Sequence, residues 1–216
     1  MDQQLLFLIN HSWAVPALDR PMAAASSFDF WWPFLLAGVI IAAIFGNFRV
    51  RMFLLTTGLA IGLTDGVVVG SLKKIVSRPR PHEVLEGVRT LDLAKAKPRF
   101  LALNKPLKEE YSTARIAPAG GNSFPSGHAA NNFTVAAVCA VYFRRWGWLV
   151  FLPAAFVAYS RIYVGAHWPL DVLTSCLIGT GIGVLMSVAI EALWRRWGLK
   201  WLPGLYEKTP SLLAVR

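Results

Sequence analysis

The sequence is poor in charge and in cysteine. Only 16% of its 216 residues are charged while 55% are hydrophobic, whereas about 25% of an ordinary soluble domain is charged. The composition excludes an ordinary soluble domain and predicts an integral membrane protein. Both cysteines, Cys139 and Cys176, fall in apolar runs, so we expect two buried thiols rather than a disulfide. Because no histidine-cysteine cluster exists, the sequence offers no zinc site.

Acidic residues are also scarce, with 12 Asp or Glu against 22 Lys or Arg and a formal net charge of +10. The segment from Lys73 to Arg115 holds eleven of the basic residues and only five acidic ones. Nucleic acid, anionic lipid headgroups or plain solvation could explain such a loop, and the apolar runs around it favour lipid headgroups. The start, Met1 to Gln4, lacks the basic region of a signal peptide, so we expect no cleavage there.

Apolar runs near the ~20 residues that cross a bilayer dominate the rest of the chain. They are residues 30–48, 52–72, 127–143 and 172–190, with a shorter run at 146–160. We predict an all-α fold, a polytopic bundle of five transmembrane helices, or six if residues 3–25 form another.

The predicted organisation has three parts. Prolines and charged residues interrupt residues 1–29 too often for a clear span. We interpret them as an amphipathic segment at the membrane interface. Residues 30–198 form the transmembrane domain, whose basic loop covers 78–125. Residues 199–216 form a C-terminal tail.

With five spans, the second and fourth end, and the third and fifth begin, on one side of the membrane. The short loops of the other side collect seven cations: Arg49, Arg51, Arg144, Arg145, Arg195, Arg196 and Lys200. Cytoplasmic loops carry such an excess, and charge in long loops such as 78–125 contributes less. We therefore expect a cytoplasmic C-terminal tail. The polar ends should face outward, the periplasmic side of a bacterial-type inner (plasma) membrane.

The polar residues at those span ends form three groups. Lys73 and Arg80 follow the second span, and Ser126, Gly127 and His128 begin the third. Ser126 is placed to cap that helix, and Gly127 leaves its N-terminus bare for an anion.

The third group joins the fourth and fifth spans and contains Arg161, His167 and Asp171. If Trp168 and Pro169 open a helix, the carboxylate of Asp171 can orient one nitrogen of His167. An interfacial cap is the structural alternative. A phosphoryl group in transfer carries negative charge that lysine, arginine and helix N-termini stabilise. One histidine could then attack phosphorus while the other protonates the departing oxygen.

These residues resemble the signature of the type 2 phosphatidic acid phosphatases, a superfamily that also includes glucose-6-phosphatase and the vanadium haloperoxidases. That signature is a lysine, six residues and Arg-Pro; then Pro-Ser-Gly-His; then Ser-Arg, five residues, His, three residues and Asp. All three parts occur here in order between residues 73 and 171. Pairing Arg78 with Pro79 would require a lysine at position 71, where Ser71 stands, so Arg80 is the motif arginine and Arg78 an accessory.

The resemblance implies that His167 is the nucleophile and forms a phosphohistidine, that Asp171 orients it, and that His128 is the general acid. It assigns phosphate binding to five residues: Lys73, Arg80, Ser126, Gly127 and Arg161. It implies no metal and no cofactor.

We predict a metal-independent membrane phosphatase that hydrolyses the terminal phosphate of a phosphorylated lipid, with no nucleic-acid partner. Candidate substrates are undecaprenyl diphosphate, phosphatidylglycerophosphate, phosphatidic acid and lipid A, with the lipid tail entering sideways between helices. Two alternatives stay open: a phosphotransferase that passes the phosphoryl group to a second lipid such as lipid A, and a non-catalytic lipid-phosphate binder or transporter.

Overall fold

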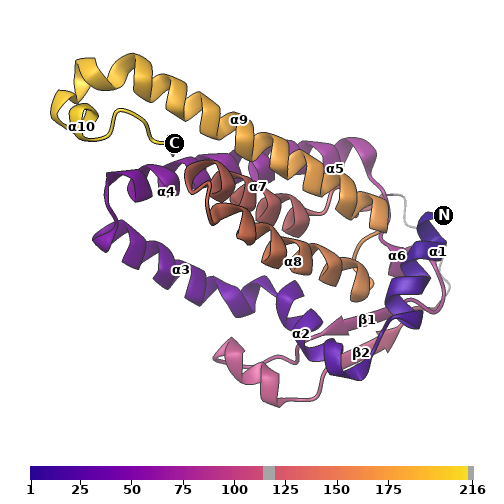
Figure 1. The fold of residues 1–216 in the computed structure, drawn as a ribbon. Helices are drawn as coiled ribbons and strands as arrows, with labels where there is room; N and C mark the ends of the chain where they lie inside the picture. The colour runs from indigo at the N-terminus through magenta and orange to yellow at the C-terminus, as the bar shows by residue number, and fades with distance from the viewer. Residues whose placement is uncertain (114–119, 214–216) are drawn as a thin grey trace.

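The computed structural model describes residues 1–113 and 120–213, and most of these residues are helical (Figure 1). Three helical segments are long and apolar enough to cross a membrane: α3 (Phe28–Phe45), the run that begins with α4 at Phe48, and α9 (Pro169–Trp201). The shorter helices α7 (Gly127–Tyr142) and α8 (Phe151–Tyr163) lie on the third and fourth predicted spans. The helical membrane fold is confirmed, whereas the count of five spans stays a prediction.

The second predicted span is one helical run made of three parts. α4 (Phe48–Ile61) continues into the π-helical segment η2 (Gly62–Val69) and then into α5 (Gly70–Val76). The run ends at Ser77, whose φ of 45° is left-handed. The prolines that follow restrict the chain further, so the polar stretch after this span leaves the helix.

Helices α7 and α9 form a close parallel pair through small residues. A Cβ added at Gly179 would lie 2.1 Å from the carbonyl oxygen of Ala130, and one at Gly183 would lie 2.6 Å from that of Thr134. Small residues let membrane helices approach this closely. Because contacts advance in the same direction along both helices, α7 and α9 begin at the same end of the bundle.

A layer of short elements covers that end (Figure 1). It contains α1 (Asp2–Phe7), the π-helical η1 (Leu8–Ser12) and α2 (Pro16–Ser26) from the N-terminus. The strands β1 (Arg89–Asp92) and β2 (Lys108–Tyr111) pair antiparallel beside them.

The segment between the second and third spans adds two further elements to this layer. They are α6 (Pro81–Val84) and the 3₁₀ helix η3 (Arg99–Asn104). The predicted basic loop is therefore partly structured within residues 78–113 and 120–125.

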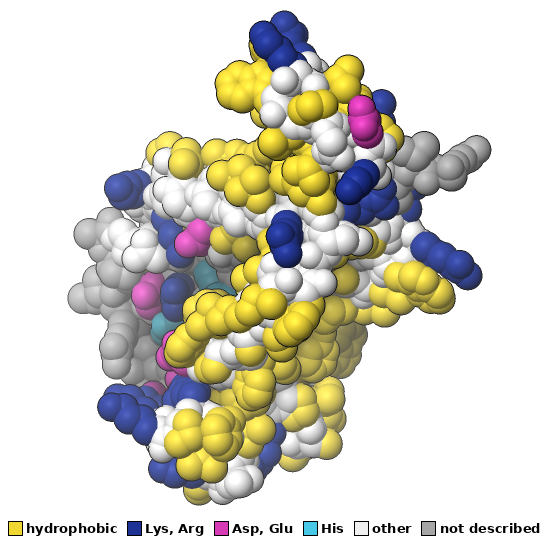
Figure 2. Space-filling model, turned by 90° about the vertical axis from the view of Figure 1, so that its left-hand side faces the viewer, with side chains coloured by type: hydrophobic (Ala, Val, Ile, Leu, Met, Phe, Trp, Pro, Cys, Tyr) yellow, Lys and Arg dark blue, Asp and Glu magenta, His cyan; other side chains and the backbone are white. Residues whose placement is uncertain are grey.

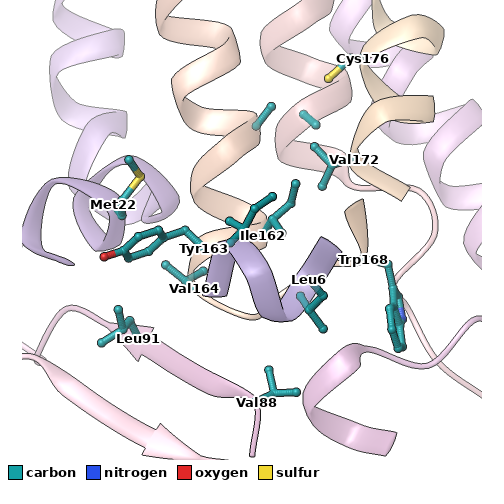
Figure 3. Packing of buried hydrophobic residues seen from close by; sticks show 13 residues of the cluster. Leu6, Met22, Val88, Leu91, Ile162, Tyr163, Val164, Trp168, Val172 and Cys176 are labelled. Carbon is teal, nitrogen blue, oxygen red and sulfur yellow. The ribbon is translucent and has the colours of Figure 1, made fainter. Parts of the chain in front are cut away.

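Hydrophobic side chains join this layer to the bundle (Figure 3). Leu6 and Met22 of the N-terminal helices, together with Leu91 of β1, belong to the same buried cluster as Tyr163 of α8 and Val172 of α9. The N-terminal segment thus packs on the ends of α8 and α9, while its predicted place at the membrane interface stays a prediction.

Buried polar contacts fix the same layer. The Asn10 side chain donates to the carbonyl oxygens of Arg89 (2.8 Å) and Tyr163 (2.7 Å). The Arg89 guanidinium donates to both carboxylate oxygens of Asp19, at 2.9 and 2.5 Å. Burial acts to raise the pKa of Asp19, but hydrogen bonds from Arg89 and Tyr163 outweigh it and lower that pKa below its usual value. The carboxylate therefore stays ionised and holds α2 to the strands.

Helix α3 stands at the edge of the bundle. Phe30 is the one residue of its 18 that is buried. The helix contacts α4 and η3, and Phe30 packs with Ala23 and Ala24 of α2. Its apolar sides are otherwise uncovered by the described part of the chain, as expected for a helix that faces lipid.

The far end of the bundle carries the remaining short elements. The 3₁₀ helix η4 (Gly147–Val150) links α7 to α8. Helix α10 (Pro203–Lys208) folds back on α9, where the rings of Tyr206 and Trp194 lie 5.7 Å apart.

Candidate active site

The predicted site residues meet at the end of the bundle where α5 and α8 end and α7 and α9 begin. Arg161 lies in the last turn of α8, and His167 lies in the turn before Pro169 starts α9. This turn is closed by Gly165, whose φ is +69° and whose added Cβ would lie 2.6 Å from the carbonyl oxygen of Arg89. Only glycine accommodates both conditions, so the turn is built against β1.

His167 is buried, with 2% of its surface exposed. Its Nδ1 lies 2.7 Å from the backbone carbonyl oxygen of Ser123. A carbonyl can only accept a hydrogen bond, so Nδ1 carries the proton and the neutral ring keeps its lone pair on Nε2. Burial lowers the pKa of His167 well below its usual value, and the charges of Arg161 and Arg80 lower it further. The imidazole is therefore neutral at physiological pH.

Asp171 contacts groups other than the imidazole that the sequence spacing assigned to it. Its Oδ2 accepts from the hydroxyl of Ser123 at 2.6 Å, and its Oδ1 accepts from Arg78 at 2.5 Å. Trp168 and Pro169 do open a helix, but His167 precedes that helix, so the i,i+4 geometry does not apply to the pair. Asp171 is linked to His167 through Ser123 instead of directly.

Arg78, considered an accessory from the sequence, holds several separate segments of the site together. While Nη1 of Arg78 binds Asp171, its Nη2 donates to the carboxylate of Asp2 at 2.7 Å. The guanidinium also lies 4.8 Å from the ring centre of Trp168. Asp2 also accepts from the backbone N–H of Leu170 at 3.0 Å. The sequence offered no signal for Asp2 or Ser123, because both act through contacts between distant parts of the chain.

The start of α7 presents two polar atoms without protein partners. Ser126 occupies the N-cap position of α7 but makes no capping hydrogen bond through its side chain, contrary to the expectation for this serine. Its buried Oγ, and the buried Nε2 of His128, have no hydrogen-bond partner among the described residues. Ser175 instead accepts from the Ser126 N–H at 2.8 Å. Orphaned buried polar atoms are costly unless a ligand or water satisfies them.

The three predicted cations surround the same region. Arg161 donates to the carbonyl oxygen of Ser26 at 2.9 Å and also to its hydroxyl. Its buried Nε finds no partner within residues 1–113 and 120–213. Lys73 is half-buried whereas Lys74 is exposed, which agrees with Lys73 as the motif lysine. The charges of Lys73 and Arg80 both act on His167.

We call the group formed by Lys73, Arg80 and Arg161 the phosphate cage. A cavity of about 500 Å³ opens beside it. Arg80, His128 and Arg161 line it together with residues of the strands and of the α2–α3 junction. Figure 2 shows histidine, acidic and basic side chains gathered in a hollow next to the apolar face of the molecule. In the described part of the chain, no group of three or more His, Cys, Asp or Glu could hold a metal ion.

Comparison with known proteins finds relatives that are named as phosphatases of membrane lipids. The chain is 45% identical over 71 residues to the undecaprenyl-diphosphatase of Sulfolobus acidocaldarius, covering 32% of this chain and 34% of that protein. It is 28% identical over 186 residues to the lipid A 4'-phosphatase of Bacteroides thetaiotaomicron, covering 83% and 72%. The chain thus spans about a third of the length of the first relative and most of the second.

A solved structure and a family model complete the comparison. The crystal structure of Aquifex aeolicus LpxE is similar over 85% of this chain and 93% of that one, with a TM-score of 0.59 and 31% identity. The sequence model of the PAP2 superfamily matches residues 50–195, which include all three groups of site residues. The chain therefore belongs to the PAP2 superfamily.

Proposed function

We propose that this protein is a metal-independent membrane phosphatase that removes the terminal phosphate of a lipid phosphate or diphosphate. The names of its relatives, undecaprenyl-diphosphatase and lipid A 4'-phosphatase, support this class of reaction. The observation that carries the proposal is the hydrogen bond from His167 Nδ1 to the carbonyl of Ser123. It leaves the Nε2 lone pair free in a buried, cation-rich site, which is the arrangement of a nucleophile.

The cage around His167 supplies the charge that a phosphoryl group needs. Lys73, Arg80 and Arg161 would neutralise its oxygens, and the N-terminus of α7 at Ser126 and Gly127 would donate hydrogen bonds. The unpartnered polar atoms of Ser126, His128 and Arg161 are the groups that this ligand would satisfy.

The reaction would follow two displacements at phosphorus. In the first, Nε2 of His167 forms a P–N bond as the bond to the lipid oxygen breaks, and His128 gives that oxygen a proton. In the second, water attacks phosphorus while His128 takes its proton, the P–N bond breaks with its electron pair returning to Nε2 of His167, and inorganic phosphate leaves. Asp171, with Ser123, would keep the imidazole oriented in both steps.

The apolar surroundings support entry of the lipid from the side. Every residue of α3 except Phe30 is at least partly exposed, and the first turn of this helix adjoins the cavity through Phe28 and Asp29. Acyl or prenyl chains could cover this uncovered face in the membrane while the phosphate reaches the cage.

Phosphate release from a panel of purified lipid phosphates tests the proposal, with His167→Ala as the decisive variant. Loss of the nucleophile should lower kcat by at least about 10³-fold, and vanadate should inhibit the wild-type protein. The exposed His11 serves as the matched control, so His11→Ala should retain turnover. Undiminished turnover in His167→Ala, or loss of wild-type activity on chelation of divalent metals, would contradict the mechanism.

A further inference from the structure

Helix α9 begins without a capping side chain of its own. Trp168 occupies its N-cap position and makes no capping hydrogen bond through its side chain, and the first N–H groups of a helix have no acceptor within it. One of them, the N–H of Leu170, donates to Oδ1 of Asp2 at 3.0 Å. A residue that lies 168 positions earlier in the chain therefore caps the helix that carries Asp171.

The second carboxylate oxygen of Asp2 reaches Asp171 by another route. Oδ2 accepts from Nη2 of Arg78 at 2.7 Å, and Nη1 of the same guanidinium donates to Oδ1 of Asp171 at 2.5 Å. A guanidinium is planar and holds its donors in a rigid fork. The position of one carboxylate therefore restricts the position of the other.

Packing holds Asp2 and Arg78 in place. The Asp2 side chain is only 15% exposed, and such partly buried charges are screened less than exposed ones. Helix α1 packs against α9, and its fully buried Leu6 belongs to the same cluster as Trp168. The indole N–H of Trp168 donates to the carbonyl oxygen of Pro79 at 2.8 Å, beside the guanidinium that lies over its ring. The bridge is thus part of the folded core.

The backbone of Arg78 contacts the other support of the imidazole. Its carbonyl oxygen accepts from the N–H of Ser123 at 2.9 Å, and the Ser123 carbonyl in turn accepts from Nδ1 of His167. A shift of Arg78 would therefore move both Asp171 and Ser123.

We propose that Asp2 is a positioning residue for the phosphatase reaction. It fixes Arg78 and the start of α9, and through them the hydrogen bonds that orient His167. This inference rests on the proposed function, because it takes His167 as the group that attacks phosphorus. Asp2 lies outside the lining of the cavity beside the phosphate cage, so it should govern kcat rather than KM.

Asp2→Asn tests this role through phosphate release from phosphatidic acid and undecaprenyl diphosphate in detergent micelles. Asparagine keeps an oxygen for the N–H of Leu170 but loses the charge that holds Arg78. It should lower kcat about tenfold, the value of one hydrogen bond to a charged group, and change KM less than about twofold. Arg78→Lys should cause a similar loss, because an ammonium lacks the planar fork that bridges two carboxylates.

Two comparisons separate positioning from a merely structural role. Glu86 is an exposed acid in the turn before β1, and Glu86→Gln makes the same charge change and should keep the wild-type kcat. Asp2→Asn in an Asp171→Asn background should lose little more than Asp171→Asn alone, because both changes act on one linkage. Losses that multiply, or an Asp2→Asn kcat within about twofold of the wild type, would overturn the proposal.

The affinity for vanadate, a phosphate analogue, provides a readout that does not need turnover. If the wild-type protein releases phosphate from neither lipid, the proposed function fails. Asp2→Asn should still weaken vanadate binding about tenfold in the wild-type background and leave it unchanged in the Asp171→Asn background. Equal affinities in the wild type and in Asp2→Asn, or no binding of vanadate to the wild type, would overturn the positioning role as well.

Discussion

Ser123 connects two residues of the site that do not touch each other. Its carbonyl accepts from His167, and its hydroxyl donates to Asp171. Asp171 is in turn held by Arg78, which also binds Asp2. The orientation of the imidazole therefore depends on a chain of hydrogen bonds that begins at the N-terminus of the protein.

A double-mutant cycle distinguishes this linkage from a direct contact between Asp171 and His167. Asp171→Asn and Ser123→Ala should each lower kcat by about 10–100-fold, the value of one hydrogen bond to a charged group. If Asp171 acts through Ser123, the double variant should lose little more than the worse single variant. Ser12→Ala, at an exposed serine, should match the wild type, and effects that simply multiply would contradict the linkage.

The lowered pKa of His167 predicts an acid-tolerant enzyme. The nucleophile must be neutral, and burial together with Arg161 and Arg80 keeps it so below its usual pKa of 6.5. The acid limb of the kcat/KM profile should therefore lie below pH 6.5, and activity should persist as the pH falls through that value. Arg80→Gln removes one of the charges, so its acid limb should move to higher pH. A wild-type limb centred at or above pH 6.5 would contradict the assignment.

Among the secondary-structure elements, the close pair α7–α9 fixes the relative positions of Ser126 and Asp171. Both residues lie at the starts of these helices, and the helices touch through Gly179 and Gly183. A change in their separation would move one half of the site relative to the other.

Gly179 and Gly181 in α9 provide a matched test of this packing. A Cβ at Gly179 meets the Ala130 carbonyl oxygen at 2.1 Å, whereas one at Gly181 meets nothing within 4 Å. Gly179→Ala should therefore lower the free energy of unfolding by about 1–3 kcal/mol through overpacking. Gly181→Ala should be neutral or stabilising by up to about 1 kcal/mol, because alanine favours helix more than glycine. Thermal unfolding in detergent measures both, and equal midpoints would contradict the packing.

Local sequence patterns predicted the helices well and the contacts between them poorly. Each apolar run coincides with a helix because hydrophobic length is a local property. The packing of η1 and α2 on α8 and β1 was not predicted, because it depends on Asn10 and Asp19 meeting Arg89 across 70 or more residues. For the same reason the motif gave the identities of His167 and Asp171 but not the role of Ser123 between them.

At the scale of the whole molecule, the two ends of the bundle differ in architecture and in charge. One end carries the cage, the strands and the N-terminal helices, and the other carries η4 and α10 (Figure 1). The N-terminus therefore lies on the same side as the candidate site. The last turns of α9 lie at the opposite end, and the number of spans between the two ends stays a prediction.

The charge distribution predicts which end faces the outside of the cell. Cations in the short connections of the far end, such as Arg49, Arg51 and Lys200, favour a cytoplasmic position for that end. Under the proposed function, the basic residues near the cage would instead bind the substrate. Cysteine scanning in a Cys139→Ala/Cys176→Ala background can test this. Lys95→Cys should react with a membrane-impermeant maleimide in intact spheroplasts, and Lys200→Cys only after the membrane is permeabilised. The reverse labelling pattern would move the site to the cytoplasmic leaflet, where only lipids of that leaflet could reach the cage.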